Sequence, residues 1–183
     1  MSDAEDTFLD GLRGCARDFA RGAAGALEAR DIRDIPDEDR AAALALARLV
    51  GSGLLGYVVP AACGGADVTP LAERERVSVR VLCAIREALA FHSGMLDVVF
   101  VEQGLGSYPV ALGGSEPLRA ALLGAVTRGE SIAAFALTED VAGSDLAGVA
   151  LEASERDDGS FVLRGHKTYI TNAGIADFYT VLA

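Results

Sequence analysis

Basic residues are scarce in this sequence. Its 183 residues include 16 Lys and Arg against 27 Asp and Glu, which makes the formal net charge −11. Nucleic-acid phosphates and anionic lipid surfaces repel so acidic a chain, and no cluster of Lys and Arg reverses the charge locally. The composition therefore argues against a nucleic-acid partner and against binding to a membrane surface.

Cysteine and histidine are scarce as well. The three cysteines, Cys15, Cys63 and Cys83, include no C-x-x-C pair, and an odd number cannot make a closed disulfide framework. The two histidines, His92 and His166, have no metal-ligand spacing to the cysteines. We expect buried or partly buried free thiols in a reducing cytoplasm, and no metal site.

Signals for export and membrane insertion are also missing. Residues Met1 to Asp6 are acidic, whereas a signal peptide needs a basic segment followed by an apolar run. The most apolar window, Ala41 to Tyr57, contains Arg48 and is too short and too interrupted to span a bilayer. These absences favour a soluble, cytoplasmic protein.

Several catalytic and nucleotide-binding signatures do not occur. There is neither a G-x-G-x-x-G dinucleotide fingerprint nor a G-x-S-x-G nucleophile elbow. The stretch Gly165-His-Lys-Thr168 differs from a phosphate-binding P-loop, because His stands where Gly must precede Lys and β-prone residues follow instead of a helix.

The sequence does have a large apolar fraction, 51%, which suffices for a hydrophobic core. Near the N-terminus apolar residues recur at three- and four-residue steps, which predicts one buried face of a helix: Phe8, Leu12, Cys15, Phe19, Ala23 and Leu27. Further helices are predicted from Pro36 to about residue 50, over about 71–90, over about 95–105, and from Ser115 to Gly129. Residues 54–60 look extended, and the charge run 73–76 is interpreted as a solvated helix face.

The pattern changes at Glu130. Short β-prone runs cover residues 132–138, 149–153, 161–164, 169–171 and 178–182, and Asp157-Asp-Gly159 is typical of a hairpin turn. Helices first and strands second predict an α+β fold, with a helical domain over 1–129 and a β-domain over 130–183. The last strand ends at Ala183 as an apolar open edge, which we expect a second polypeptide or a missing C-terminal portion to cover.

Two motifs carry the functional signal. They are Phe135-Ala-Leu-Thr-Glu-Asp-Val-Ala-Gly-Ser-Asp145 and Gly165-His-Lys-Thr-Tyr-Ile-Thr-Asn172. Thr138 to Asp145 of the first motif form a predicted loop, which can present N–H groups and hydroxyls to a carbonyl-rich ring system. By itself, a loop of Gly, Ser and Asp is most often a turn.

The order of these motifs, with a hairpin between them, is similar to the middle β-domain of acyl-CoA dehydrogenases and related flavoproteins. Gly53-Leu-Leu-Gly-Tyr-Val-Val-Pro60 with Gly64-Gly65 resembles the same family. Leu105 to Pro109 and Gly113 to Glu116 fit its helix-to-helix connection. The resemblance implies an N-terminal all-α domain, then the start of an antiparallel β-barrel-like middle domain, with the C-terminal helical bundle absent.

The resemblance also implies FAD as cofactor. The implied flavin-binding residues are Phe135, Leu137, Thr138, Gly143, Ser144, Tyr169, Ile170 and Thr171. In the family, the position of Thr138 bonds the pyrimidine side of the ring, that of Thr171 lies near N5, and that of Ser144 also binds the acyl thioester. Read without the resemblance, Phe135, Leu137 and Ile170 are ordinary sheet core, the threonines are β-formers, and Tyr169 is cross-strand packing.

This sequence departs from the family pattern at two points. Asp140 and Val141 stand where relatives usually have Pro and Gly, which predicts a differently shaped loop or weaker FAD binding. The family's catalytic Glu lies in the C-terminal half, which is absent here, so no catalytic residue is assigned in this chain. Glu139 and Asp145 are interpreted as loop and turn carboxylates.

The resemblance therefore predicts half of an FAD-dependent enzyme that dehydrogenates an acyl thioester. Either a second polypeptide in a hetero-oligomer would supply the catalytic base, or these residues are a fragment whose missing half carries it. By analogy, Met95 to Leu105 would line the acyl pocket, with Glu102 and Gln103 as polar selectors or in solvated or capping roles. Two alternatives stay open: a flavin-dependent oxygenase or oxidase of the same fold, and a non-catalytic scaffold without FAD.

Overall fold

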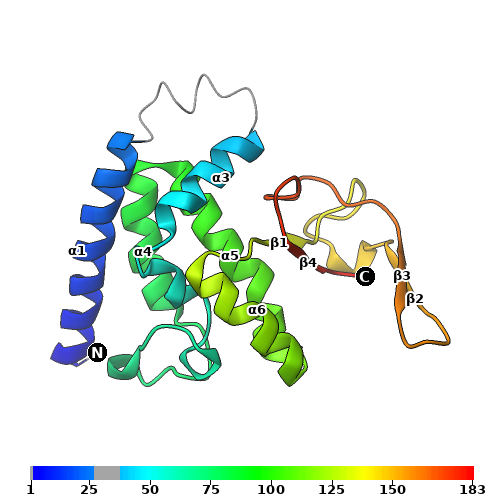
Figure 1. The fold of residues 1–183 in the computed structure, drawn as a ribbon, viewed down its shortest axis with the longest axis horizontal. Helices are drawn as coiled ribbons and strands as arrows, with labels where there is room; N and C mark the ends of the chain where they lie inside the picture. Colours follow the sequence, from blue (N-terminus) through cyan, green and yellow to red (C-terminus); the bar gives the residue numbers. More distant parts are fainter. Residues whose placement is uncertain (1, 27–37) are drawn as a thin grey trace.

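The computed structural model describes residues 2–26 and 38–183. Its helices are α1 (Asp3–Ala26), α3 (Glu38–Leu49), α4 (Val79–His92), α5 (Gly94–Gly113) and α6 (Glu116–Arg128). Short 3-10 helices follow α3 and the strands begin after α6; the strands are β1 (Ala133–Ala136), β2 (Glu152–Glu155), β3 (Phe161–Arg164) and β4 (Phe178–Val181). Figure 1 shows the helices packed together on one side and the strands on the other. The α+β architecture is confirmed, while the predicted domain boundary near residue 130 stays a prediction.

Helix α1 packs against α4 through a stripe of mostly small residues. The buried members are Leu9, Leu12, Ala16, Ala20 and Ala23, and Phe8 and Phe19 are partly buried beside them. Cys15 was expected on this stripe but is exposed, because it lies one residue from Ala16 and so points about 100° away from the buried face. Leu27 lies outside the described residues.

The cysteines contradict the expectation of buried thiols. Cys15 and Cys83 are exposed on α1 and α4, and only Cys63 is partly buried. Both exposed thiols lie on the outer faces of helices whose inner faces are packed with aliphatic residues. The neighbouring residues Ala16 and Ala84 are buried instead.

Helix α4 begins later than the sequence predicts, at Val79 instead of residue 71. Ser78 caps it, with its hydroxyl accepting a hydrogen bond from the Val81 N–H at 3.4 Å. The charge run 73–76 therefore lies in the preceding loop and not on a helix face. The inner face of α4 consists of the buried Val81, Ile85 and Leu89, with Leu82 partly buried beside them.

The region around α3 differs in a similar way. The predicted helix start at Pro36 lies outside the described residues, and the helix ends at Leu49, before Gly51 and Gly53, as expected. Residues Leu54–Val58, expected to be extended, form the 3-10 helix η1, whose Leu54, Leu55 and Val58 are buried.

Helix α5 runs without a break through Gly104, Gly106 and Pro109, where the sequence predicts an interruption. Gly106 lets the sheet approach: a Cβ there would lie 2.7 Å from the Ala133 Cβ and 3.0 Å from the Ala134 N and O atoms. Leu105 to Pro109, predicted to belong to the helix-to-helix connection, thus lie inside α5, whereas the other predicted part, Gly113 to Glu116, does contain the turn, at Gly114. Helix α6 begins after Ser115, with proline in its first turn, and ends at Gly129, as predicted.

Strand β1 is held on α5 by side chains that act like a neighbouring strand. The Gln103 amide accepts from the Ala133 N–H at 2.7 Å and donates to the Ser131 carbonyl at 3.2 Å. The Glu102 carboxylate accepts from the Phe135 N–H at 2.8 Å. Both buried side chains thus satisfy backbone groups of the strand segment, a role that the sequence did not predict, and the solvated alternative is wrong for them.

The other edge of β1 pairs with β4 in parallel, with Ala133 opposite Phe178. This pairing differs from the antiparallel expectation, because the long connection from Leu137 to Asp177 carries the chain back to start β4 at the same end as β1. Strands β2 and β3 form the predicted antiparallel hairpin, with Gly159 at a φ of 78° in its turn. The hairpin projects away from the helices (Figure 1).

Residues 169–171 were predicted to form a strand and do not. Tyr169 and Asn172 have φ values of 55° and 64°, which a β-ladder does not accommodate.

Within the described residues, none of the helices has both the length and the apolar character that crossing a membrane requires.

Candidate functional site

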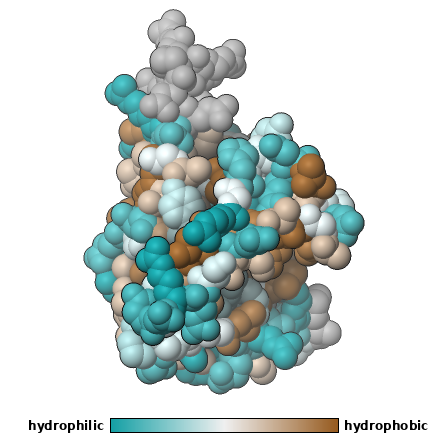
Figure 2. All heavy atoms as spheres, turned by 90° about the vertical axis from the view of Figure 1, so that its right-hand side faces the viewer, coloured by the Kyte–Doolittle hydropathy of each residue, from teal (hydrophilic) through white to brown (hydrophobic). Residues whose placement is uncertain are grey.

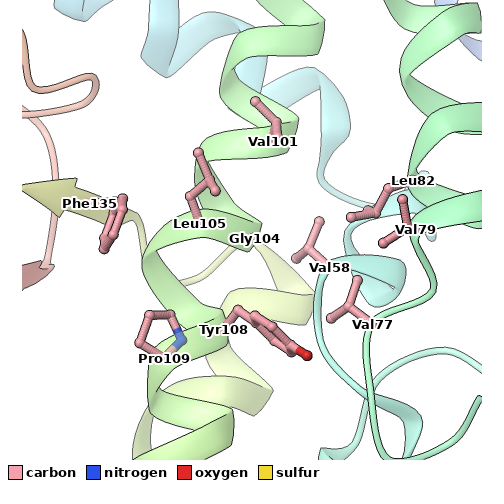
Figure 3. A pocket seen from close by; sticks show the side chains of 10 residues that line it. All are labelled: Val58, Val77, Val79, Leu82, Val101, Gly104, Leu105, Tyr108, Pro109 and Phe135. Carbon is pink, nitrogen blue, oxygen red and sulfur yellow. The ribbon is translucent and has the colours of Figure 1, made fainter. Parts of the chain in front are cut away.

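An apolar pocket of about 310 Å³ lies between the helices and the first strand (Figure 3). Its lining comes from η1, the loop before α4, α4, α5 and β1: Val58, Val77, Val79, Leu82, Val101, Gly104, Leu105, Tyr108, Pro109 and Phe135. Residues 101–105 belong to the predicted acyl-pocket segment, whereas Val58, Val77, Val79 and Tyr108 come from parts of the chain that the sequence pattern did not bring together.

Phe135 connects this pocket with the first motif. Figure 3 shows the Phe135 ring on one side of α5, and Val79 and Leu82, which belong to α4, on the other side. Strand β1 then continues past Phe135 into the loop 137–145. The pocket and the predicted cofactor-binding loop are therefore adjacent parts of one surface.

The structure brings the two motifs side by side. The Thr168 N–H donates to the Thr138 carbonyl at 2.9 Å, and the Lys167 Nζ donates to the Leu137 carbonyl at 2.9 Å. Residues 137–138 and 169–171, which the sequence proposes as flavin contacts, thus flank one shared set of hydrogen bonds.

Glu139 lies at the centre of this junction. Its carboxylate accepts from Lys167 Nζ at 2.7 Å, from the Ala150 N–H at 2.8 Å and from the Leu151 N–H at 3.0 Å. These donors, the Lys167 hydrogen bond foremost, lower the pKa of Glu139 to about 2. So firmly ionised a carboxylate is a poor proton acceptor, which supports its interpretation as a loop carboxylate. Asp145 likewise accepts from the Ala147 N–H at 3.2 Å, in a turn.

We expect Glu139 to contribute acid-sensitive stability. Its folded pKa of about 2 lies below the ordinary value of 4.5, so its contribution is complete above pH 4.5 and is lost as the pH falls toward 2. Acid unfolding of the wild type and of Glu139→Gln, followed by circular dichroism, measures the difference. The stability gap between the two proteins should narrow across this pH range; a gap that stays constant would contradict the assignment.

The predicted site residues form a largely open surface. Phe135, Leu137, Thr138, Ile170 and Thr171 are half-buried, Gly143 and Ser144 are exposed, and Tyr169 is 91% exposed. The backbone N–H groups of residues 143–145 and 169–171 donate to no acceptor within the described residues. A planar ring system with carbonyl oxygens and ring nitrogens is the kind of ligand that such donors and apolar side chains fit.

The unusual pair Asp140-Val141 forms the tip of a tight turn. Glu139 and Ala142 close the turn with mutual backbone hydrogen bonds of 2.9 and 3.2 Å. Both tip residues are exposed, so the altered residues change the tip and leave the bonded base of the loop intact.

Two residues of the second motif have structural roles that the sequence did not assign. One is Lys167, described above. The other is Asn172, which is buried and donates from Nδ2 to the Ala133 carbonyl at 3.1 Å. Its positive φ is the feature that explains an Asn at this position, since Asn tolerates this conformation better than most residues.

Hydrophobic side chains gather on the outer face of the strand region. Figure 2 shows this face, with hydrophobic residues between hydrophilic ones. The exposed hydrophobic residues of the strand region are Val141, Leu146, Phe161, Leu163, Tyr169 and Tyr179.

Among the described residues, no group of three or more His, Cys, Asp or Glu is arranged to hold a metal ion.

Comparison with known proteins identifies relatives of this chain. A family model described as "Acyl-CoA dehydrogenase, middle domain" matches residues 134–183. Cyclohexane-1-carbonyl-CoA dehydrogenase of Geobacter metallireducens is 33% identical over 131 residues, which cover 72% of this chain and 32% of the relative.

Solved structures agree over almost the whole chain. Butyryl-CoA dehydrogenase from Megasphaera elsdenii matches with a TM-score of 0.74 and 28% identity, over 99% of this chain and 44% of that one. An acyl-CoA dehydrogenase complexed with FAD from Bacillus anthracis matches with a TM-score of 0.70 and 25% identity, over 96% of this chain and 29% of that one. This chain spans about a third of the length of the curated relative and less than half of either solved chain. In sequence and in fold, the chain belongs to the acyl-CoA dehydrogenase family.

Proposed function

We propose that this chain forms one wall of an FAD site and the acyl pocket of an enzyme that dehydrogenates an acyl thioester. The observation that carries the proposal is the position of the apolar pocket beside Phe135, on the strand that leads into the paired motifs. The relatives support the same chemistry, since one acts on a CoA thioester and another was solved with FAD.

The proposed flavin surface consists of the two paired segments. Phe135, Leu137, Tyr169 and Ile170 would supply apolar contacts. Hydrogen bonds would come from the hydroxyls of Thr138, Ser144 and Thr171 and from the open N–H groups at 143–145 and 169–171. When bound, FAD supplies the acceptor for the hydride that leaves the substrate.

We assign an uncharged hydrocarbon acyl group to the pocket. Among the described residues that line it, Tyr108 is the one with a polar side chain, and none carries a charge that would pair with a second carboxylate of a dicarboxylic acyl group. Burying such a carboxylate without a partner costs several kcal/mol. Ser144, exposed at the end of the first motif, remains our candidate for contact with the thioester.

The proton-abstracting base is proposed to come from outside these 183 residues. Three carboxylates near the site are already engaged: Glu102 with the Phe135 N–H, Glu139 with Lys167, and Asp145 with the Ala147 N–H. A C-terminal half that supplies the base is therefore part of the proposal, either as a second polypeptide in a hetero-oligomer or as a continuation of this chain. The cytoplasmic location stays a prediction.

Flavin binding tests the proposed function directly. The purified full chain, titrated with FAD, should develop the shifted visible spectrum of protein-bound flavin. Thr138→Val and Thr171→Val should each weaken FAD binding roughly three- to tenfold, because each loses one hydrogen bond. The dissociation constants can be measured by fluorescence quenching of the flavin.

Thr127→Val is the matched control, because its hydroxyl donates to the Gly124 carbonyl within α6, which belongs to neither motif. It should bind FAD as the wild type does. A chain that binds no FAD, either alone or with added candidate partner polypeptides, would leave the scaffold alternative as the better explanation.

A further inference from the structure

Glu139 and Lys167 form a buried ion pair that the proposed flavin contacts do not include. The two side chains are 5% and 8% exposed and lie 2.7 Å apart. Each is further bonded to backbone, the carboxylate to the Ala150 and Leu151 N–H groups and the ammonium to the Leu137 carbonyl. Because desolvation offsets much of the attraction in a buried pair, net stability is a weak reason for its presence.

Its position suggests another reason. Glu139 directly follows Thr138 in the first segment, and Lys167 lies two residues before Tyr169 in the second. Lys167 binds the Leu137 carbonyl, and the adjacent Thr168 N–H binds the Thr138 carbonyl. These bonds determine which residue of one segment lies opposite which residue of the other.

The pair also determines the charge beside the proposed site. Adjacent opposite charges largely cancel each other, whereas a single buried charge acts strongly on its surroundings because the local dielectric constant is low. Reduced flavin is commonly anionic, so an uncompensated carboxylate would disfavour it and an uncompensated ammonium would favour it.

We propose that Glu139 and Lys167 are positioning residues for the flavin, which set the alignment of segments 137–138 and 168–171 and keep the site electrically balanced. The proposal rests on the proposed function for its ligand, but the alignment of the two segments is testable without any ligand.

The first test is amide hydrogen exchange of the full chain without FAD. In Glu139→Ala, the Ala150 and Leu151 amides should exchange at least about tenfold faster than in the wild type. In Lys167→Met, the Thr168 amide should show the same acceleration. The matched controls are Arg128→Met and Glu130→Gln, which break an exposed ion pair of the same 2.7 Å length and should leave these amides unchanged. Unchanged exchange in the Glu139 and Lys167 variants would overturn the proposal.

The second test is the midpoint potential of bound FAD, with FAD itself as the probe. Lys167→Met should lower the potential, Glu139→Gln should raise it, and the double variant should return toward the wild-type value. A merely structural role predicts weaker binding in both single variants without opposite shifts, so shifts of the same sign would overturn the charge balance. If the wild type binds no FAD, the proposed function fails, and hydrogen exchange alone decides whether the pair aligns the segments.

Discussion

Gly106→Ala should lower the free energy of unfolding by about 3 kcal/mol, since inserting a methyl group into a tightly packed contact forces helix and strand apart. The new Cβ would lie 2.7 Å from the Ala133 Cβ and 3.0 Å from two backbone atoms of Ala134. Backbone atoms cannot swing aside as a flexible side chain can. Urea unfolding followed by circular dichroism measures the loss as a lower midpoint with an unchanged slope.

Gly11→Ala is the matched control for this substitution. Gly11 lies within α1, and a Cβ there would meet nothing within 4 Å. Alanine is the better helix former, so this variant should gain about 0.5–1 kcal/mol. If Gly106→Ala gained stability as Gly11→Ala does, helix propensity would outweigh the α5–β1 contact, and the close approach would not explain Gly106.

Gln103→Leu should destabilise the protein by about 2–5 kcal/mol, because it leaves two buried backbone groups without a partner. Leucine has a similar size, but it cannot accept from the Ala133 N–H or donate to the Ser131 carbonyl. Gln103 is fully buried, with 0% exposure, so water cannot replace either bond. Chemical denaturation gives the loss of stability, and exchange of the Ala133 amide shows whether β1 has detached.

Glu102→Gln is the companion variant, because its amide oxygen can still accept from the Phe135 N–H. Burial raises the pKa of Glu102 above 4.5, although the Phe135 hydrogen bond opposes the shift. A raised pKa means that ionisation of Glu102 costs stability at neutral pH and that this cost disappears as the pH falls below 4.5. The free energy of unfolding of the variant, relative to that of the wild type, should therefore be highest at neutral pH. A relative stability that increases on acidification would contradict the assignment.

Much of the helical half could be predicted from local patterns. The inner face of α4, the proline in the first turn of α6 and the glycine after it depend on residue spacing and on cap chemistry, which short stretches of sequence contain. The hairpin turn at Gly159 was predictable for the same reason. One prediction failed where distant residues decide, since Gly106 looked like a helix breaker and is a contact with β1. Another failed on a local detail, since Cys15 looked buried but lies about 100° from the buried face of α1.

Local sequence patterns likewise predicted one part of the candidate site, and contacts between distant residues decided the rest. The residue types of the two motifs were readable as a possible flavin surface, but whether the motifs meet was not, since residues 138 and 168 are joined only by the folded backbone. The pocket beside Phe135 likewise collects residues from four elements.

By itself, the sequence determined the acidic charge, the order of helices before strands, and the two motifs that indicate the family. Only the tertiary structure decided that α5 continues through its glycines, that its Glu102 and Gln103 complete the edge of β1, and that Lys167 joins the motifs through Glu139. The physical reason is that spacing and capping act between neighbours in the chain. The burial of a charge, the pairing of a backbone group and the room left by a missing Cβ depend on residues far apart in sequence.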